Sequence, residues 1–339
     1  MLMNSKSRQV QKTYLTITLL TTLATSFIWG INTLFLLDAG LNNTGAFAAN
    51  AFFTLGQLVF EVPTGVIADT WGRRSSFLLG SSTLLLSTIF YLLMWNMQAA
   101  FWAWALASAL LGLGFTFFSG AVEAWLVDSL KFTKYKGDLD PVFAKGQIVG
   151  GIAMLSGSVA GGIIAQFTNL GVPYILRAVI LGLSFVVAYV LMKDLGFVPE
   201  RGETTLKQIH KISRASIQHG WKNPPVRYLM MAAPFTAGIG FYAFYAMQPY
   251  LLELYGDPNA YSIAGLAAAI VASAQIAGGL SVSLVRKLFN KRTNILIIGI
   301  VVSSLSLLFI GLTNIFWLAV VLLAIWGLVF AATGPVRQA

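Results

Sequence analysis

The chain has 339 residues, of which 57% are hydrophobic and 10% are charged, and its formal net charge is +10. A soluble globular protein has about 25% charged residues, so this composition excludes an ordinary soluble domain and favours a protein in lipid. Cysteine is absent from the sequence, which excludes disulfides and cysteine metal sites.

Ten apolar segments are each long enough to cross a bilayer as a helix, which takes about 20 residues. Lipid offers the backbone no hydrogen-bond partners, and the segments are too long for barrel strands, so each is expected to be a helix. In chain order they cover residues 14–37, 45–69, 74–95, 99–127, 142–167, 173–193, 227–254, 259–284, 293–312 and 315–337. We therefore predict an all-α, polytopic membrane protein.

The basic residues alternate in their placement along the chain. All but two of the 22 lysines and arginines lie before the first segment, or in or within a few residues of every second loop after it. The loops between, such as 38–45 and 255–259, contain none. By the positive-inside rule, this distribution predicts a cytoplasmic amino terminus and a cytoplasmic segment 194–226. Because the positive charge is explained by topology, no nucleic-acid partner is expected.

The segment 194–226 is the only long polar connection, and we place the domain boundary there. It separates a six-helix bundle, 1–193, from a four-helix region, 227–339. A shift of 214 residues aligns the two parts. It pairs Tyr14 with Tyr228, Glu61 with Gln275, Gly65 with Gly279 and Gly120 with Gly334. This pattern predicts a parallel repeat of membrane bundles. The first part continues through two more helices than the second, so we expect ten of twelve helices, with a truncated carboxyl terminus.

The stretch "GVIADTWGRR" joins the second and third segments. It carries Gly65, Asp69, Gly72, Arg73 and Arg74 in the spacing G-x-x-x-D-x-x-G-R-R. In this motif, and in its six-plus-six pattern, the chain resembles the major facilitator superfamily of secondary transporters. The resemblance implies alternating access, in which two bundles rock about a central site. The fifth segment, "GGIAMLSGSVAGG", is similar to the motif of drug/proton antiporters, with serine where that motif has proline.

The charges of this motif oppose the helix dipoles. Asp69 is at the carboxyl end of one helix, and Arg73 and Arg74 are at the amino end of the next, so each placement is unfavourable by itself. We predict that partners across a helix interface make the motif a conformational gate, and the resemblance implies that Asp69 faces the eleventh helix. The alternative is that these charges only set topology. The other residues predicted for the gate are Glu123, Asp128 and Arg337, the repeat equivalent of Glu123.

Two acids are candidates for proton coupling. An ionisable residue inside a membrane segment is a functional hypothesis by default. Glu61 lies eight residues before Asp69, about 12 Å along a helix, and Glu123 lies near the inner end of the fourth segment. A structural role for Glu61 is the alternative, because it shares a helix face with Gly65 and Asp69.

The resemblance implies that the first, fourth, seventh and tenth helices line a central cavity. Their candidate cavity residues are Trp29, Asn32, Ser119, Tyr242, Tyr245, Gln248 and Trp326. Together they favour a hydrophobic or amphiphilic solute, although a single aromatic side chain more often packs or lies in an interfacial belt. The small residues of "GSVAGG" and "AGLAAAIVASAQIAGG" predict close helix packing in the fifth and eighth segments.

We predict a secondary active transporter in the cell membrane that exports a small amphiphilic or hydrophobic solute by proton antiport. Its expected partners are the solute, protons and membrane lipid, and it is expected to be a monomer without cofactor or metal. One alternative is a nutrient or metabolite carrier of the same fold. Another is a receptor-like or lipid-scrambling protein that transports nothing. An enzyme is not expected, because we find no Ser-His-Asp set, phosphate loop or metal cluster in the sequence.

Overall fold

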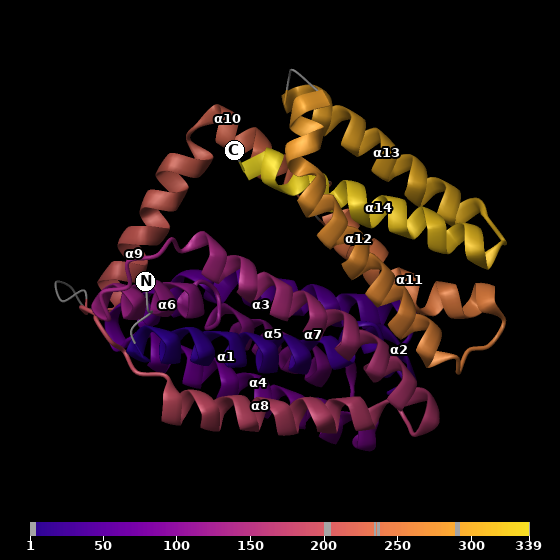
Figure 1. The fold of residues 1–339 in the computed structure, drawn as a ribbon. Helices are drawn as coiled ribbons and strands as arrows, with labels where there is room; N and C mark the ends of the chain where they lie inside the picture. The colour runs from indigo at the N-terminus through magenta and orange to yellow at the C-terminus, as the bar shows by residue number, and fades with distance from the viewer. Residues whose placement is uncertain (1–4, 200–204, 234, 236–237, 289–291, 339) are drawn as a thin grey trace. The chain divides into compact units, whose positions relative to one another are not determined.

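The computed structural model describes residues 5–199, 205–233, 235, 238–288 and 292–338 (Figure 1). The elements found there are all helices, and the first eight are α1 (Ser5–Trp29), α2 (Asn32–Asp38), α3 (Asn43–Trp71), α4 (Arg73–Met97), α5 (Phe101–Thr116), α6 (Ala121–Phe132), α7 (Asp140–Phe167) and α8 (Gly171–Leu191). They are followed by α9 (Thr205–Ser216), η1 (Ile217–Trp221), α10 (Pro224–Ala233), α11 (Ile239–Tyr255), α12 (Tyr261–Leu288), α13 (Arg292–Leu312) and α14 (Phe316–Gln338). This confirms the predicted all-α class.

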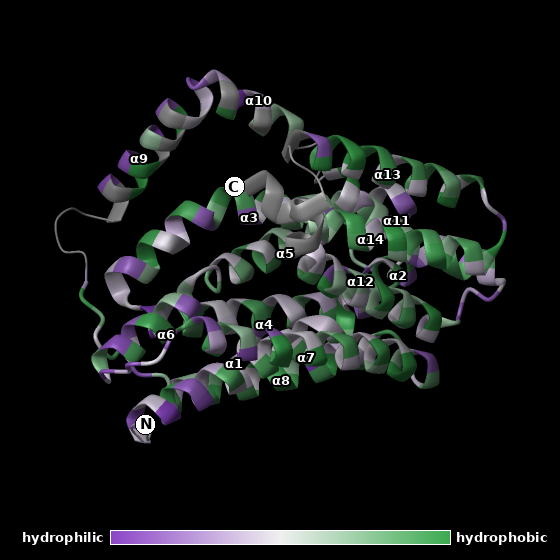
Figure 2. Ribbon diagram, turned by 45° about the horizontal axis from the view of Figure 1, so that its top comes forward, coloured by the Kyte–Doolittle hydropathy of each residue, from purple (hydrophilic) through white to green (hydrophobic). Residues whose placement is uncertain are grey.

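In the described part of the chain, eight helical stretches are long and apolar enough to cross a membrane. One of them, Phe101–Phe132, contains both α5 and α6, and the bent pair of α1 and α2 makes a possible ninth span. Nine of the ten predicted segments are thus matched. The other, 227–254, is divided between α10 and α11, with residues 234, 236 and 237 outside the described part. Figure 2 shows mainly hydrophobic and weakly polar residues along the spans, whereas α9 mixes hydrophilic and hydrophobic ones.

The chain forms two compact units. Unit 1 comprises Met1–Ala24, Leu36–Ala153 and Tyr174–Met231. Unit 2 comprises Thr25–Phe35, Met154–Pro173 and Ala232–Ala339. In unit 1, α5 packs on α3 and α4, and α4 also contacts α6. In unit 2, α14 packs on α12 and α13, and α11 contacts α12 and α14. The middle of the first span and the end of the fifth therefore belong to unit 2, and the predicted boundary at 194–226 stays a prediction.

The core of unit 1 positions the motif hairpin. Tyr14 of α1, Phe77 of α4, Trp125 of α6 and Met192, just after α8, are buried together in one cluster. Trp125 also donates its indole N–H to the Lys193 carbonyl, 2.7 Å away. The packing of these large side chains, together with this hydrogen bond, holds the start of α4 close to the chain that follows α8.

Small residues bring helices into close contact, as predicted for the fifth and eighth segments. Gly162 of α7 and Gly265 of α12 pack so closely that a Cβ on Gly162 would lie 2.9 Å from the Gly265 Cα. In unit 1, a Cβ on Gly56 of α3 would meet the backbone of Ala109 in α5 at 3.0 Å. A larger residue at these glycines would force the helices apart.

Candidate functional site

Gly72 alone separates α3 from α4. Its φ of 101° lies in the region that favours glycine. On either side of it, Asp69 and Arg73 form an ion pair, with Arg73 Nη2 2.7 Å from Asp69 Oδ1. Each charge thus has a partner of opposite sign inside the hairpin, which relieves the conflict with the helix dipoles. Both side chains are partly exposed, so the pair is worth at most about 1 kcal/mol.

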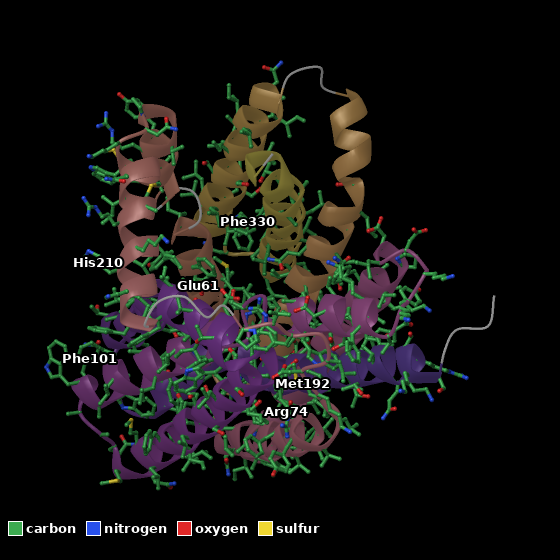
Figure 3. All side chains as sticks on the ribbon, turned by 90° about the vertical axis from the view of Figure 1, so that its left-hand side faces the viewer. Glu61, Arg74, Phe101, Met192, His210 and Phe330 are labelled. Atoms are coloured by element: carbon green, nitrogen blue, oxygen red, sulfur yellow. The ribbon has the colours of Figure 1, made fainter. Side chains whose placement is uncertain are left out.

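Arg74 is held by the end of α8 and the residues beyond it. Its Nη2 donates to the Tyr189 carbonyl at 2.6 Å, and its guanidinium carbon lies 5.0 Å from the centre of the Tyr189 ring. Its backbone N–H donates to Asp194 Oδ1 at 2.9 Å. Asp194 therefore caps the first turn of α4, where free N–H groups favour an anion. Figure 3 labels Arg74 and nearby Met192.

Burial raises the pKa of the Asp194 carboxyl, and the hydrogen bond from Arg74 and the charges of Arg74 and Arg73 oppose that rise. Asp194 was not predicted from the sequence as a site residue, because an acid that follows a membrane segment is typical of a solvated linker. One signal in the structure is Gly72, where a Cβ would overlap the Asp194 carboxylate. Gly72 is therefore required both for its backbone conformation and for this close approach.

The other predicted gate residues lie on α6 and α14. Among the side chains that the structure describes, Arg73 pairs with Asp69, and no ion pair joins it or Arg74 to Glu123 or Asp128. Glu123 is exposed in the first turn of α6, and Asp128 is partly buried. Their part in the gate stays a prediction. The side chain of Arg337 lies outside the described part of the structure.

Two candidates from different predictions meet in unit 1. The Ser119 hydroxyl donates to Glu61 Oε1 at 2.7 Å, which joins a proton-coupling candidate on α3 to a cavity candidate of the fourth span. Both side chains are exposed in this structure, and Glu61 is labelled in Figure 3. A Cβ on Gly65, one turn further along α3, would meet nothing within 4 Å. The Glu61 face of α3 therefore remains open beside Gly65.

Ser119 lies in a break of the fourth span, between α5 and α6. Gly120 has a φ of 66°, which favours glycine. The first turn of α4 holds the break, because the buried Ser76 hydroxyl donates to the Phe117 carbonyl at 2.8 Å. The Phe118 ring stacks on Phe77, with 4.7 Å between ring centres. The sequence predicted this span as continuous, and its interruption is a finding of the structure.

A second break interrupts the first span at residues 30–31, between α1 and α2, which are bent by 49°. In unit 2, Gln248 of α11 contacts both sides of it. Gln248 Nε2 donates to the Trp29 carbonyl at 3.0 Å, and Gln248 Oε1 accepts the Thr33 N–H at 2.8 Å. The Trp29 ring lies on Phe244, 4.8 Å between centres. Two predicted cavity residues, Trp29 and Gln248, are thus brought together.

The remaining cavity candidates differ in exposure. Tyr242 is 59% exposed, whereas Trp326 is buried and stacks on Phe330 with 5.6 Å between ring centres. Asn32 is buried beside the break of the first span, and Tyr245 packs edge-on to Phe244. Their contact with a solute stays a prediction.

The multiple spans, the two helical units and the charged hairpin define a protein embedded in a membrane. The family model of the Major Facilitator Superfamily matches residues 14–339, and the chain belongs to that family. It is therefore a secondary transporter rather than an enzyme. No curated protein sequence matches the chain.

Solved structures of transporters are similar in fold. A crystal structure of the nucleoside transporter NupG is 12% identical with a TM-score of 0.76, over 98% of this chain and 81% of that chain. A bacterial homologue of the human lysosomal transporter Spinster, in an inward-facing and unoccupied conformation, is 15% identical with a TM-score of 0.68, over 98% and 74%. A D-xylose–proton symporter is 15% identical with a TM-score of 0.53, over 98% and 80%. At these identities the likeness shows the fold alone.

Proposed function

We propose that this transporter exports a small amphiphilic or hydrophobic solute by alternating access, in exchange for protons, with Glu61 as a proton-carrying residue. The hydrogen bond from Ser119 to Glu61 is the observation that supports this proposal. A hydrogen bond to an ionised carboxylate is roughly twice as strong as one between neutral groups. Protonation of Glu61 would therefore weaken the link between α3 and the break of the fourth span.

The solute class follows from the side chains near the broken first span. Trp29, Phe244 and Tyr245 offer a group of aromatic rings in unit 2. Aromatic faces favour flat apolar groups and organic cations. The amide of Gln248 is already bonded to backbone groups, which leaves one polar side chain fewer for a solute rich in hydroxyl groups. A metabolite carrier of the same fold is the competing function.

The test is proton flux in proteoliposomes that contain the full-length protein. An amphiphilic dye cation, a nucleoside and D-xylose are each added to vesicles that carry a pH gradient. We expect only the dye to release the gradient, and we expect Glu61→Gln to reduce that release to the rate of empty vesicles. Glu253→Gln is the matched control, because Glu253 is an exposed acid near the end of α11.

Each contrary result would overturn a different part of the proposal. Wild-type proton flux in Glu61→Gln would remove Glu61 from the coupling step. Flux with the nucleoside or the sugar alone would favour the metabolite carrier, and an absence of flux with every solute would favour a protein of this fold that does not transport.

We also infer that the protein is a monomer in the cell membrane. Its amino terminus and residues 194–226 face the cytoplasm. The alternating basic loops support this orientation. Because the sequence has no cysteine, single cysteines at Lys207 and at Asn43 can be labelled with an impermeant thiol reagent. Labelling of intact cells at 43 but not at 207 is expected, and the reverse pattern would invert the topology.

A further inference from the structure

The break of the first span has an unusual hydrogen-bond arrangement. In a continuous helix the Thr33 N–H would donate to the Trp29 carbonyl, four residues earlier. Here the Gln248 amide stands between those two groups, with Oε1 2.8 Å from the Thr33 nitrogen and Nε2 3.0 Å from the Trp29 oxygen. A side chain that inserts into the hydrogen-bond ladder is a recognised cause of a sharp kink. The 49° bend is therefore explained by a residue of α11.

The inserted side chain must both donate and accept. Gln248 is only 3% exposed and Thr33 is fully buried, so the Thr33 N–H cannot turn to water instead, whereas the bond to the Trp29 carbonyl is part-buried. A carboxamide offers an acceptor oxygen and a donor nitrogen on one planar group. A glutamate at this position could do the same only when protonated, because an ionised carboxylate has no hydrogen to donate to Trp29.

The Thr33 hydroxyl differs from the hydroxyls of other helical threonines. It is buried and, among the residues that the structure describes, has no hydrogen-bond partner. Helical threonines elsewhere in the chain donate to the carbonyl four residues earlier, as Thr21 does to Ile17 at 2.8 Å and Thr88 does to Leu84 at 2.7 Å. For Thr33 that carbonyl belongs to Trp29, which lies across the break and accepts from Gln248 instead. An unpaired buried hydroxyl is unfavourable, so the bent form carries a defect that a straight helix would remove.

We propose that Gln248 is the positioning residue of a two-state break in the first span. The span is bent while the amide is inserted. When α11 withdraws the amide, the Thr33 N–H and hydroxyl both return to the Trp29 carbonyl and the span straightens. The backbone groups have partners in both states, so the two forms are close enough in free energy to exchange.

Neighbouring packing is compatible with this exchange. A cavity of about 10 Å³ adjoins Gln248, lined mainly by apolar side chains of α11 and α12. The Trp29 ring, on Phe244 one turn before Gln248, would lose that contact when the amide leaves. The bend depends on neither solute nor proton gradient, so it is independent of the transport proposed above.

The populations of the two forms can be measured without a solute. The full-length protein is labelled with 5-fluorotryptophan in micelles, and the ¹⁹F resonance of Trp29 is identified by its loss in Trp29→Phe. We expect Gln248→Leu to move the Trp29 population from the ring-stacked to the unstacked resonance by about tenfold, since two buried hydrogen bonds are removed. Gln275→Leu, which removes an amide from α12, should leave the ratio unchanged.

Two further variants separate this mechanism from simple misfolding. Gln248→Glu should match the wild type at about pH 4 and match Gln248→Leu at about pH 9, the range in which a buried carboxyl loses its proton. Thr33→Val should favour the bent form, because it deletes the unpaired hydroxyl, whereas Thr21→Val should not.

The proposal is overturned if Gln248→Leu keeps the wild-type ratio, or if the ratio in Gln248→Glu is as independent of pH as in Gln275→Glu. If Gln248→Leu does not fold, Gln248→Glu and Thr33→Val decide the question. Loss of proton-coupled flux in Glu61→Gln has no bearing on this outcome, so the two proposals fail independently.

Discussion

The first and the fourth membrane spans are both interrupted, but different groups hold the two breaks. In the first span, the neutral amide of Gln248 replaces a missing helical hydrogen bond; Gln248 and Thr33 are buried, and the bond to the Trp29 carbonyl is part-buried. In the fourth span, a glycine turn at Gly120 makes the break, and the carboxylate of Glu61 is bound at its exposed edge.

This difference determines what each break can respond to. A buried neutral amide has no charge to gain or lose, so the break at Trp29 can change only when α11 moves. The break at Ser119 is bonded to a carboxylate, so the arrival of a proton can change it directly. The break of the first span is therefore suited to respond to a movement of α11, and the break of the fourth span to protonation of Glu61.

The largest expected effect concerns how firmly each break is packed. At the first span, a Cβ on Gly161 would overlap the backbone of Phe27, which cannot turn aside. At the fourth span, a Cβ on Gly80 would meet the Phe118 ring at 2.8 Å and the Phe117 Cβ at 2.9 Å, and the ring can move more easily than a backbone carbonyl. We expect Gly161→Ala to lower the free energy of unfolding, measured by SDS titration in mixed micelles, by about 3 kcal/mol, and Gly80→Ala by about 1 kcal/mol.

Gly182→Ala on α8 is the control for this pair, because its Cβ would meet nothing within 4 Å. Equal losses for Gly161→Ala and Gly80→Ala would mean that the two breaks are packed with the same rigidity.

A smaller effect concerns the connection between α4 and the fourth span. Ser76→Ala leaves the Phe117 carbonyl without its buried donor, and we expect a loss of about 1–2 kcal/mol. Ser87→Ala removes a similar buried bond to Ala107, away from the break, and is the matched control. Both variants should lose stability, but only Ser76→Ala should reduce the Glu61-dependent proton flux. Equal proton flux in the two variants would mean that the bond from α4 to the break has no effect on Glu61-dependent transport.

Nine of the ten spans and the position of the motif hairpin were predicted from the sequence. Long apolar runs predicted the membrane helices because the bilayer imposes a single length scale. Small residues predicted the close contact of Gly162 with Gly265. Neither break was predicted. The bend at Trp29 involves no proline, and Gln248, which bonds across it, lies 215 residues from Thr33. A single glycine, Gly30, does not by itself identify a bend.

The hairpin site was predicted only in part, because one of its partners is distant in the sequence. The spacing of Asp69, Arg73 and Arg74 marked the motif, and the structure pairs the first two. Asp194 was missed because its partner, the Arg74 N–H, is 120 residues away and is a backbone group, which every sequence contains. Capping from a distant residue depends on tertiary packing, here on the burial of Met192 and Trp125.

The smallest expected effect is the pH dependence of the stability that the Asp194 cap contributes. This cap lies on the first turn of α4, the same turn whose Ser76 bonds to the break of the fourth span. Burial raises the pKa of Asp194 in the folded state, so the folded protein keeps this proton at a pH where the unfolded chain has released it. The contribution to stability is therefore greatest at low pH and is lost as the pH rises above about 4 and through the folded pKa.

Asp194→Asn keeps an acceptor oxygen for the Arg74 N–H and removes the buried charge. We expect it to abolish this decline and to change stability at neutral pH by less than about 1 kcal/mol, measured by SDS titration at a series of pH values. Asp138→Asn, in an exposed turn, should keep the wild-type profile. If Asp194→Asn is less stable than the wild type only above the pKa of Asp194, where the carboxyl is ionised, the carboxylate stabilises α4 through its charge. Protonation at Asp194 would then loosen the cap, and both ends of the link from α4 to the fourth span would respond to protons, in contrast to the first span.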